Sequence, residues 1–382
     1  MRVFLIAGEA SGDRLGAALM AGLKTLTEVE FLGVGGPLME AQGMRSLYPM
    51  DDLSVHGFVE VLKQYPDLRR RLHQSVDAVL EARPDVLITI DSPDFCLRVA
   101  RMVRAKSDVR TVHYVAPSVW AWRPGRAAKM ARYIDHVLAL LPFEPPYMEA
   151  AGMECDFVGH PVVSEAQASP AQVTAFREAH GLGEAPLLMV LPGSRRSEVA
   201  QLAPIFGAAL HEVCGARPGL RVVVPATEAR AFQVRELIAH WPGKPVVIAP
   251  DGRSADAYAL EKTAAFGASD RALAASGTVS LELAAADTPM LIAYDVHPLS
   301  RMILNRMLRV DTLTLVNLVS GTRDVPELLG RDCVPSRIAP KLLELLDDPG
   351  KQPDAMRLTM ERLGRGGEAP GLRAARAVLN RI

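Results

Sequence analysis

Short runs of apolar residues alternate along the chain with longer stretches in which apolar residues recur every three or four positions. The short runs are typical of buried parallel strands, and the longer stretches are typical of amphipathic helices. The pattern predicts strands at 3–7, 30–34, 86–90, 111–115, 137–141 and 155–158, separated by helices such as 15–26 and 97–106. It restarts with strands at 187–191, 221–224, 246–248, 271–275 and 290–294. Two such series predict an α/β protein with two Rossmann-like, doubly wound domains.

The two series also set the expected domain boundaries. We expect a first domain at 1–163 and a second at 164–350, since the second series follows a small, polar stretch at 164–169. Residues 351–382 are expected to form C-terminal helices, which could pack back on the first domain. Two domains of this kind that face each other across a cleft place their ligands between the carboxyl ends of the two sheets.

Composition narrows the function classes. The net charge of −1 over 382 residues argues against a nucleic-acid binder that works through overall positive charge. The four cysteines are widely separated and form no CxxC pair, which fits a reducing cytosol and predicts neither a disulfide framework nor a zinc site. The apolar N-terminal run is too short for a signal peptide, and no window approaches 18 uncharged apolar residues. We therefore expect a soluble or peripheral protein.

The first glycine-containing loop, 8–13, follows the first predicted strand and opens a helix. Its Gly8, Ser11 and Gly12 are candidates for holding an anion at the start of that helix. An ordinary turn capped by Ser11 or Asp13 explains the loop equally well. Because the spacing is not GxGxxG, dinucleotide binding is not indicated.

Two further loops belong to the second series. In 191–198, a glycine turn is followed by Ser194, Arg195 and Glu198, and the backbone N–H groups together with Arg195 suit a diphosphate. The alternative is a capped turn with solvated arginines. Two adjacent cations, Arg195 and Arg196, are not stabilised by the positive end of a helix dipole, which favours the binding interpretation. In 275–282, the candidate ligands are small or acidic: Ser276, Gly277, Thr278 and Glu282. A plain helix cap also explains this loop, and only the pairing of the two loops makes a nucleotide-diphosphate pocket the better interpretation.

Catalytic and sugar-binding candidates lie in the first series. Asp91 and Asp94 follow a strand end, where one carboxylate is placed to act as a general base and the other to perturb it; a capping or solvated role is the alternative. The stretch 117–126 combines two tryptophans with arginines, which suits a sugar face, a phosphate or a lipid head group. Its candidate residues are Ser118, Trp120 and Arg123, and core packing of one tryptophan is the competing interpretation.

Two apolar stretches with flanking cations, 50–72 and 300–310, have the composition of interfacial segments at an anionic membrane. Amphipathic helices that face a protein core are the alternative. The candidate membrane or acyl-chain contacts in the first stretch are Leu53, Val55, Phe58, Val59 and Leu62.

In combination these stretches resemble the lipid-A-disaccharide synthase family, inverting glycosyltransferases of the two-Rossmann GT-B type. The resemblance is carried by 8–16, 90–95, 113–122, 141–144, 157–161, 191–199, 275–283 and 316–318. One departure is Arg196-Ser197, where a family member can carry Gly-Ala. The resemblance implies transfer of 2,3-diacylglucosamine from its UDP derivative to the 6-hydroxyl of 2,3-diacylglucosamine 1-phosphate, giving a β-1,6 disaccharide and UDP.

The resemblance also implies roles for individual residues. The second domain would bind UDP through the loop residues named above and Asn317, and Asp94 of the first would deprotonate the acceptor with support from Asp91. Neither a metal nor a cofactor is expected. We expect the protein to work at the cytoplasmic face of the inner membrane, in contact with an anionic lipid surface. No nucleic-acid partner is expected, and a homodimer is one possible assembly. Alternatives are another UDP-sugar enzyme, such as a UDP-N-acetylglucosamine epimerase or a peptidoglycan-type transferase, and a non-catalytic lipid-binding scaffold.

Overall fold

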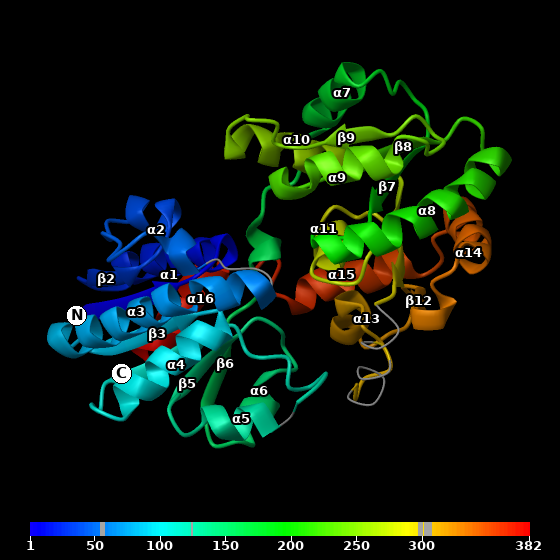
Figure 1. The fold of residues 1–382 in the computed structure, drawn as a ribbon. Coiled ribbons are helices and arrows are strands. Elements are labelled where there is room, and N and C mark those ends of the chain that lie inside the picture. Colours follow the sequence, from blue (N-terminus) through cyan, green and yellow to red (C-terminus); the bar gives the residue numbers. More distant parts are fainter. Residues whose placement is uncertain (54–57, 124, 297–300, 302–307) are drawn as a thin grey trace. The chain divides into compact units, whose positions relative to one another are not determined.

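The computed structural model describes residues 1–53, 58–123, 125–296, 301 and 308–382, and of the segment 58–64 it describes the backbone only. These residues form two compact units, one made of Met1–Ser164 with Leu363–Ile382 and the other of Glu165–Arg362. Each unit contains a six-stranded parallel sheet with helices packed on it (Figure 1). The prediction of two doubly wound domains is therefore confirmed. The expected boundaries at 163 and 350 stay predictions.

The sheet of the first unit has the strand order β2-β1-β3-β4-β5-β6. Its order reverses between β1 and β3, so the loops that follow these two strands meet at the carboxyl edge of the sheet. The strands are β1 (Arg2–Ala7), β2 (Glu30–Val34), β3 (Val86–Ile90), β4 (Arg110–Tyr114), β5 (His136–Ala139) and β6 (Glu154–Phe157). The helices are α1 (Ala10–Leu26), α2 (Pro37–Ala41), α3 (Phe58–Ala82), α4 (Pro93–Arg104), α5 (Gly125–Met130), α6 (Pro145–Glu149) and α16 (Pro370–Leu379), with 3₁₀ turns at Met50–Leu53 and Pro161–Ser164.

Both faces of this sheet are covered, which explains why its central strands β1 and β3 read as nearly continuous apolar runs. All five residues of β3 are buried. On one face, α1 and α16 pack through residues such as Leu19 and Val378. On the other face, α3 and α4 pack through residues such as Val79 and Val99. The C-terminal helix α16 thus completes the core of the first unit, beside α1 (Figure 1).

The second unit has the strand order β12-β11-β10-β7-β8-β9. The order reverses between β7 and β10, which brings the loops after these strands together. The strands are β7 (Leu187–Leu191), β8 (Arg221–Pro225), β9 (Val246–Ile248), β10 (Arg271–Ala274), β11 (Met290–Tyr294) and β12 (Glu327–Leu329). The helices are α7 (Pro170–Ala179), α8 (Arg196–Ala216), α9 (Glu228–Ile238), α10 (Ala255–Ala268), α11 (Val279–Ala285), α13 (Leu315–Ser320), α14 (Pro335–Asp347) and α15 (Gln352–Arg362), with a 3₁₀ turn at Gly330–Asp332.

Among the described residues, α8 is the one helix that is long and apolar enough to cross a membrane. Its residues Leu202, Phe206 and Leu210 belong to the same buried cluster as strands β7 and β8. The apolar composition of α8 is accounted for by this packing, because a helix in the centre of a core needs little polar surface.

Strand boundaries agree with the sequence pattern to within two residues, except that β12 was not predicted. This strand has three residues, each half-buried, and pairs only with β11 at the edge of the sheet. A strand this short, without a fully buried face, leaves no periodic signal.

Candidate active site

A cavity of about 420 Å³ lies at the carboxyl edge of the second unit, where the order of its strands reverses. The loops after β7 and β10 supply most of its lining. The predicted residues that it brings together are Ser194, Arg195, Glu198, Ser276, Gly277, Thr278 and Glu282. The cavity also has walls from the loop after β8, including Thr227, and from α10, including Tyr258 and Lys262.

The loop after β7 is organised by Glu198. Its carboxylate accepts hydrogen bonds from the backbone N–H groups of Ser194 and Arg195, each at 3.2 Å, and pairs with the Arg195 guanidinium at 2.8 Å. The Tyr294 hydroxyl donates a further bond of 3.2 Å to it, and burial together with the Glu198 charge raises the pKa of Tyr294 to about 12. The glycine turn is required, because Gly193 has φ +113° and a Cβ there would lie 2.6 Å from the Glu198 Cβ. Glu198 therefore shapes the loop, and the Arg195 side chain that it pairs with is still 76% exposed and accessible to a ligand.

Opposite this loop, Glu282 of α11 forms an ion pair with Lys262 of α10, with 2.5 Å between Nζ and Oε2. The Lys262 ammonium also lies 5.3 Å from the centre of the Phe266 ring. Sequence reasoning missed Lys262, and its only signal was its place one helical turn after Tyr258, which also lines the cavity. With one oxygen held by Lys262, the carboxylate has a fixed orientation and a second oxygen that can accept bonds from hydroxyl groups.

Asn317 does not line this cavity within the described part of the chain. It is 1% exposed, and its amide donates to Val325 O at 2.9 Å and accepts from Val325 N at 3.1 Å. Its Nδ2 also reaches Thr312 Oγ1 at 3.3 Å, at the start of the segment whose Leu313 carbonyl accepts the Ser276 hydroxyl at 3.4 Å. The structure thus places Asn317 behind the Ser276 loop, as a support for it.

The first unit has a second group of predicted residues at its own strand reversal, between β1 and β3. Asp91 and Ser92 both have left-handed backbone conformations, with φ +50° and +39°. A Cβ at Gly8 would lie 2.6 Å from the Ser92 hydroxyl oxygen, so any larger residue there would require Ser92 to move. Burial raises the pKa of Asp91, against the lowering effect of hydrogen bonds from the Ser92 backbone and the Ser11 side chain. A strained backbone next to a carboxyl group with a shifted pKa is typical of a functional site.

Other residues of the first loop make contacts within the unit. Gly12 is buried against Ile90. Asp13 is buried and accepts three backbone hydrogen bonds, of 2.9 to 3.0 Å, from Gly36, Leu38 and Met39. It therefore caps α2, and the proposed capping of α1 by Ser11 or Asp13 is wrong, because the N-cap of α1 is Glu9 and carries no side-chain cap bond.

Asp94 stands at the start of α4, exposed, in the wall of a cavity of about 430 Å³. The cavity has an apolar wall formed by Leu53, Leu68, Leu72 and Phe95, and its charged groups include Arg69 and Arg98. The predicted acyl contact Leu53 is therefore brought beside Asp94. Val55 and the side chains of Phe58, Val59 and Leu62 lie outside the described residues, as does most of 300–310. Asp91 is not among the described residues that line this cavity.

The tryptophan loop follows β4, the neighbour of β3. Trp120 is half-buried, donates from Nε1 to Glu144 Oε1 at 3.3 Å and packs edge-on against Phe143, with ring centres 5.1 Å apart. Ser118 and Arg123 are exposed, and the Arg123 guanidinium lies 4.5 Å from the centre of the Trp122 ring. Glu144 is 4% exposed, and burial raises its pKa to about 7. Sequence reasoning gave Glu144 no role, although it lies in one of the stretches that carry the resemblance.

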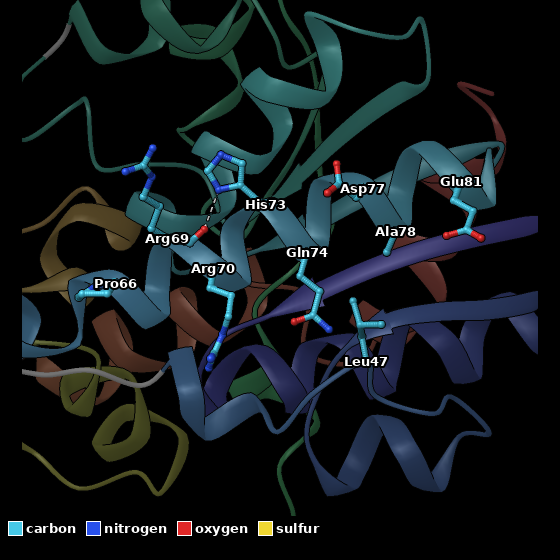
Figure 2. Close-up of a pocket in the computed structure, with 9 residues that line it drawn as sticks. All are labelled: Leu47, Pro66, Arg69, Arg70, His73, Gln74, Asp77, Ala78 and Glu81. Carbon is cyan, nitrogen blue, oxygen red and sulfur yellow. Dashed lines mark hydrogen bonds between the residues drawn. The ribbon is translucent and has the colours of Figure 1, made fainter.

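A larger cavity of about 820 Å³ is lined by residues of α3, among them Arg69 and Arg70, and by Leu47. Figure 2 shows Arg69 and His73 on one side of α3, and Arg70 and Gln74 on the other. No group of three or more His, Cys, Asp or Glu residues suited to a metal ion occurs in the described ranges, and the four cysteines are free thiols.

Several solved structures with a similar fold are named as UDP-GlcNAc 2-epimerases, and another is named as a glycosyltransferase. The likeness extends over all of this chain and 99% of the chain of the UDP-GlcNAc 2-epimerase from Neisseria meningitidis, with a TM-score of 0.67 at 11% identity. A glycosyltransferase from Rickettsia africae has a TM-score of 0.60 at 12% identity, with 99% of this chain and 97% of that chain covered. At these identities the likeness shows the fold, which is the GT-B architecture of glycosyltransferases and related epimerases.

Sequence comparison identifies the family within this class. The family model described as Lipid-A-disaccharide synthetase matches residues 3–371. The lipid-A-disaccharide synthases of Ruegeria pomeroyi and Rhodospirillum centenum are 63% and 49% identical, each over 100% of this chain and over 96% and 94% of their own lengths. The chain belongs to the lipid-A-disaccharide synthetase family and is a glycosyltransferase, which confirms the resemblance and rules out the epimerase and scaffold alternatives.

Proposed function

We propose that the chain catalyses the lipid-A-disaccharide synthase reaction with its donor bound in the second unit and its acceptor in the first. The reaction of the family transfers 2,3-diacylglucosamine from its UDP derivative to the 6-hydroxyl of 2,3-diacylglucosamine 1-phosphate, with inversion. The observation that carries this assignment of roles is the Asp94 cavity, because it combines an exposed carboxylate, an apolar wall and two arginines in one place.

The donor site would be the 420 Å³ cavity. The Arg195 guanidinium is suited to the diphosphate, together with those backbone N–H groups of the two loops that do not already donate to Glu198. Glu282, oriented by Lys262, is suited to the ribose hydroxyls. Glu198 and Asn317 would act indirectly, by holding the two loops in place.

Asp94 would act as the general base. It would accept the proton of the acceptor 6-hydroxyl as that oxygen attacks the anomeric carbon and the bond to UDP breaks, with the electron pair leaving on the diphosphate. Arg195 and the loop N–H groups would stabilise the departing charge, so the proposal needs no metal ion. Asp91, outside the cavity and bonded to Ser11, would support the loop.

The remaining predicted residues would complete the acceptor side. Gly8, Ser11 and Gly12 form the loop beside Asp91, and Ser118, Trp120 and Arg123 belong to the neighbouring loop after β4. The assignment of 1–163 as the acceptor domain and of 164–350 as the UDP domain is part of the same proposal.

The apolar stretch from Leu53 to Leu62 would contact acyl chains and the anionic cytoplasmic face of the inner membrane, because apolar anchors beside cations suit that surface. Co-sedimentation with anionic vesicles tests this contact, and light scattering tests the expected homodimer.

The experiment that tests the role of Asp94 compares Asp94→Asn with Asp108→Asn, which removes an exposed carboxylate of the same unit. Loss of a general base lowers kcat by roughly 10²- to 10⁴-fold, whereas the control should retain wild-type turnover. Disaccharide formation is measured at saturating donor. Equal activity of Asp94→Asn and Asp108→Asn would contradict the assignment.

A further inference from the structure

The cavity around Asp94 contains two arginines that no role assigned so far uses. Arg69 reaches it from α3 and Arg98 from α4, one turn after Asp94. Within the described part of the chain, neither guanidinium has an ion-pair or hydrogen-bond partner. Glu9 and Asp94 are the carboxylates in the described lining.

Several other arginines of the same unit are held by carboxylates. Arg71 is paired with Asp52 at 2.6 Å, and Arg104 and Arg110 are paired with Asp135 and Glu154. A guanidinium presents a fixed fork of donors that matches a phosphate, and its charge is most useful where an apolar wall lowers the local dielectric. Leu68, Leu72 and Phe95 supply such a wall here.

We propose that Arg69 and Arg98 bind the phosphomonoester of the acceptor and make the enzyme specific for a phosphorylated sugar. This inference rests on the proposed function, since it takes the Asp94 cavity as the acceptor site. The acceptor of the reaction carries a phosphate of about −1.5 to −2 charges at pH 7 on C1, whereas the reacting hydroxyl is on C6. A cavity of about 430 Å³ is large enough for a sugar with its hydroxyl at Asp94 and its phosphate at the arginines.

The phosphates of the donor do not require Arg69 and Arg98. Its diphosphate already has a site in the second unit, formed by the glycine turn and Arg195. The two arginines are therefore assigned to the second phosphate-bearing substrate, and they select it by charge, whereas the apolar wall selects it by its acyl chains.

The test uses two acceptors, 2,3-diacylglucosamine 1-phosphate and the same sugar without phosphate, and measures kcat/KM for each. Arg98→Gln and Arg69→Gln should each lower kcat/KM for the phosphorylated acceptor by roughly 10- to 100-fold, the size of a charge-assisted hydrogen bond. Turnover of the unphosphorylated acceptor should change by less than about threefold. The KM for the donor should stay the same.

Matched controls lie on the same two helices. Arg101→Gln removes an exposed cation of α4, and Arg70→Gln removes an arginine of α3 that is paired with Asp67 at 2.9 Å and lies on the other side of the helix from Arg69 (Figure 2). Both controls should keep the preference for the phosphorylated acceptor. If the wild type does not turn over the unphosphorylated sugar, calorimetric binding of the phosphorylated acceptor replaces the comparison, and only Arg98→Gln and Arg69→Gln should weaken it.

Equal losses with both acceptors, or no loss in either variant, would overturn the inference. Failure of the proposed function gives a different result, in which Asp94→Asn also keeps full activity with both acceptors. If Asp94→Asn is inactive while Arg98→Gln and Arg69→Gln keep the wild-type preference, the acceptor site is correct and its phosphate is bound by other groups.

Discussion

Replacing Glu144 by glutamine should make the protein's stability less dependent on pH. The Glu144 carboxyl is 4% exposed, and burial raises its pKa from 4.5 to about 7, although Leu141 N at 3.0 Å and Trp120 Nε1 at 3.3 Å donate to it. Between these two pH values the folded state holds a proton that the unfolded state has lost, so stability falls as pH rises. Below 4.5 both states are protonated, and above 7 both are ionised.

The size of the effect follows from the shift. About 2.5 pKa units at 1.36 kcal/mol each correspond to about 3 kcal/mol of unfolding free energy lost between pH 4.5 and pH 8. Glutamine keeps an amide oxygen that can accept from Leu141 N, and it does not titrate. The free energy of unfolding of Glu144→Gln, taken relative to the wild type, should therefore rise by about 3 kcal/mol across this range.

The assay is urea unfolding at several pH values, followed by tryptophan fluorescence, since Trp120 and Trp122 lie in the same unit as Glu144. Glu149→Gln on α6 is the matched control, because Glu149 is exposed and the effect predicted for Glu144→Gln depends on burial. A constant difference between Glu144→Gln and the wild type from pH 4 to pH 8 would refute the reasoning, because it would mean that the buried carboxyl titrates normally.

Three further predictions concern the second unit. Gly193→Ala should raise the donor KM at least tenfold. Residue 193 has φ +113°, and a Cβ there would lie 2.6 Å from the Glu198 Cβ, so alanine should distort the diphosphate loop. An unchanged donor KM would contradict this prediction. Lys262→Met should raise the donor KM roughly 5- to 50-fold by releasing Glu282, with kcat and the acceptor KM little changed, as steady-state kinetics can show. Asn317→Ala should destabilise the protein by about 2–4 kcal/mol, since it leaves Val325 N and O buried without their partner, and thermal unfolding would detect this.

The architecture was predictable because the strands carry their own signal. The five residues of β7 are apolar and buried, and β3 is also fully buried, with Thr89 as its one polar residue, as expected for strands covered on both faces. The polar loops after these strands were predictable as sites for a related reason. In a doubly wound sheet, the loops that meet at the strand reversal are fixed by topology. Chain order therefore indicated where Asp94 and Ser194 would lie.

Long-range partners were not predictable in the same way. Lys262 and Glu282 lie on different helices, and Arg69 lies on a helix whose contact with the Asp94 loop depends on tertiary packing. The sequence also could not separate ligand-binding polar residues from supporting ones. Glu198 and Asn317 stand in motif stretches, but their polar atoms are bonded to the protein's own backbone. Hydrogen-bond partners distinguish these roles, and partners appear only once the chain is folded.

The most direct test of the account is UDP release from UDP-2,3-diacylglucosamine, measured in detergent with EDTA, with and without 2,3-diacylglucosamine 1-phosphate. The account predicts UDP release only when the acceptor is present, together with an equal amount of β-1,6-linked disaccharide. UDP release that does not depend on the acceptor, or no turnover by properly folded protein, would contradict it.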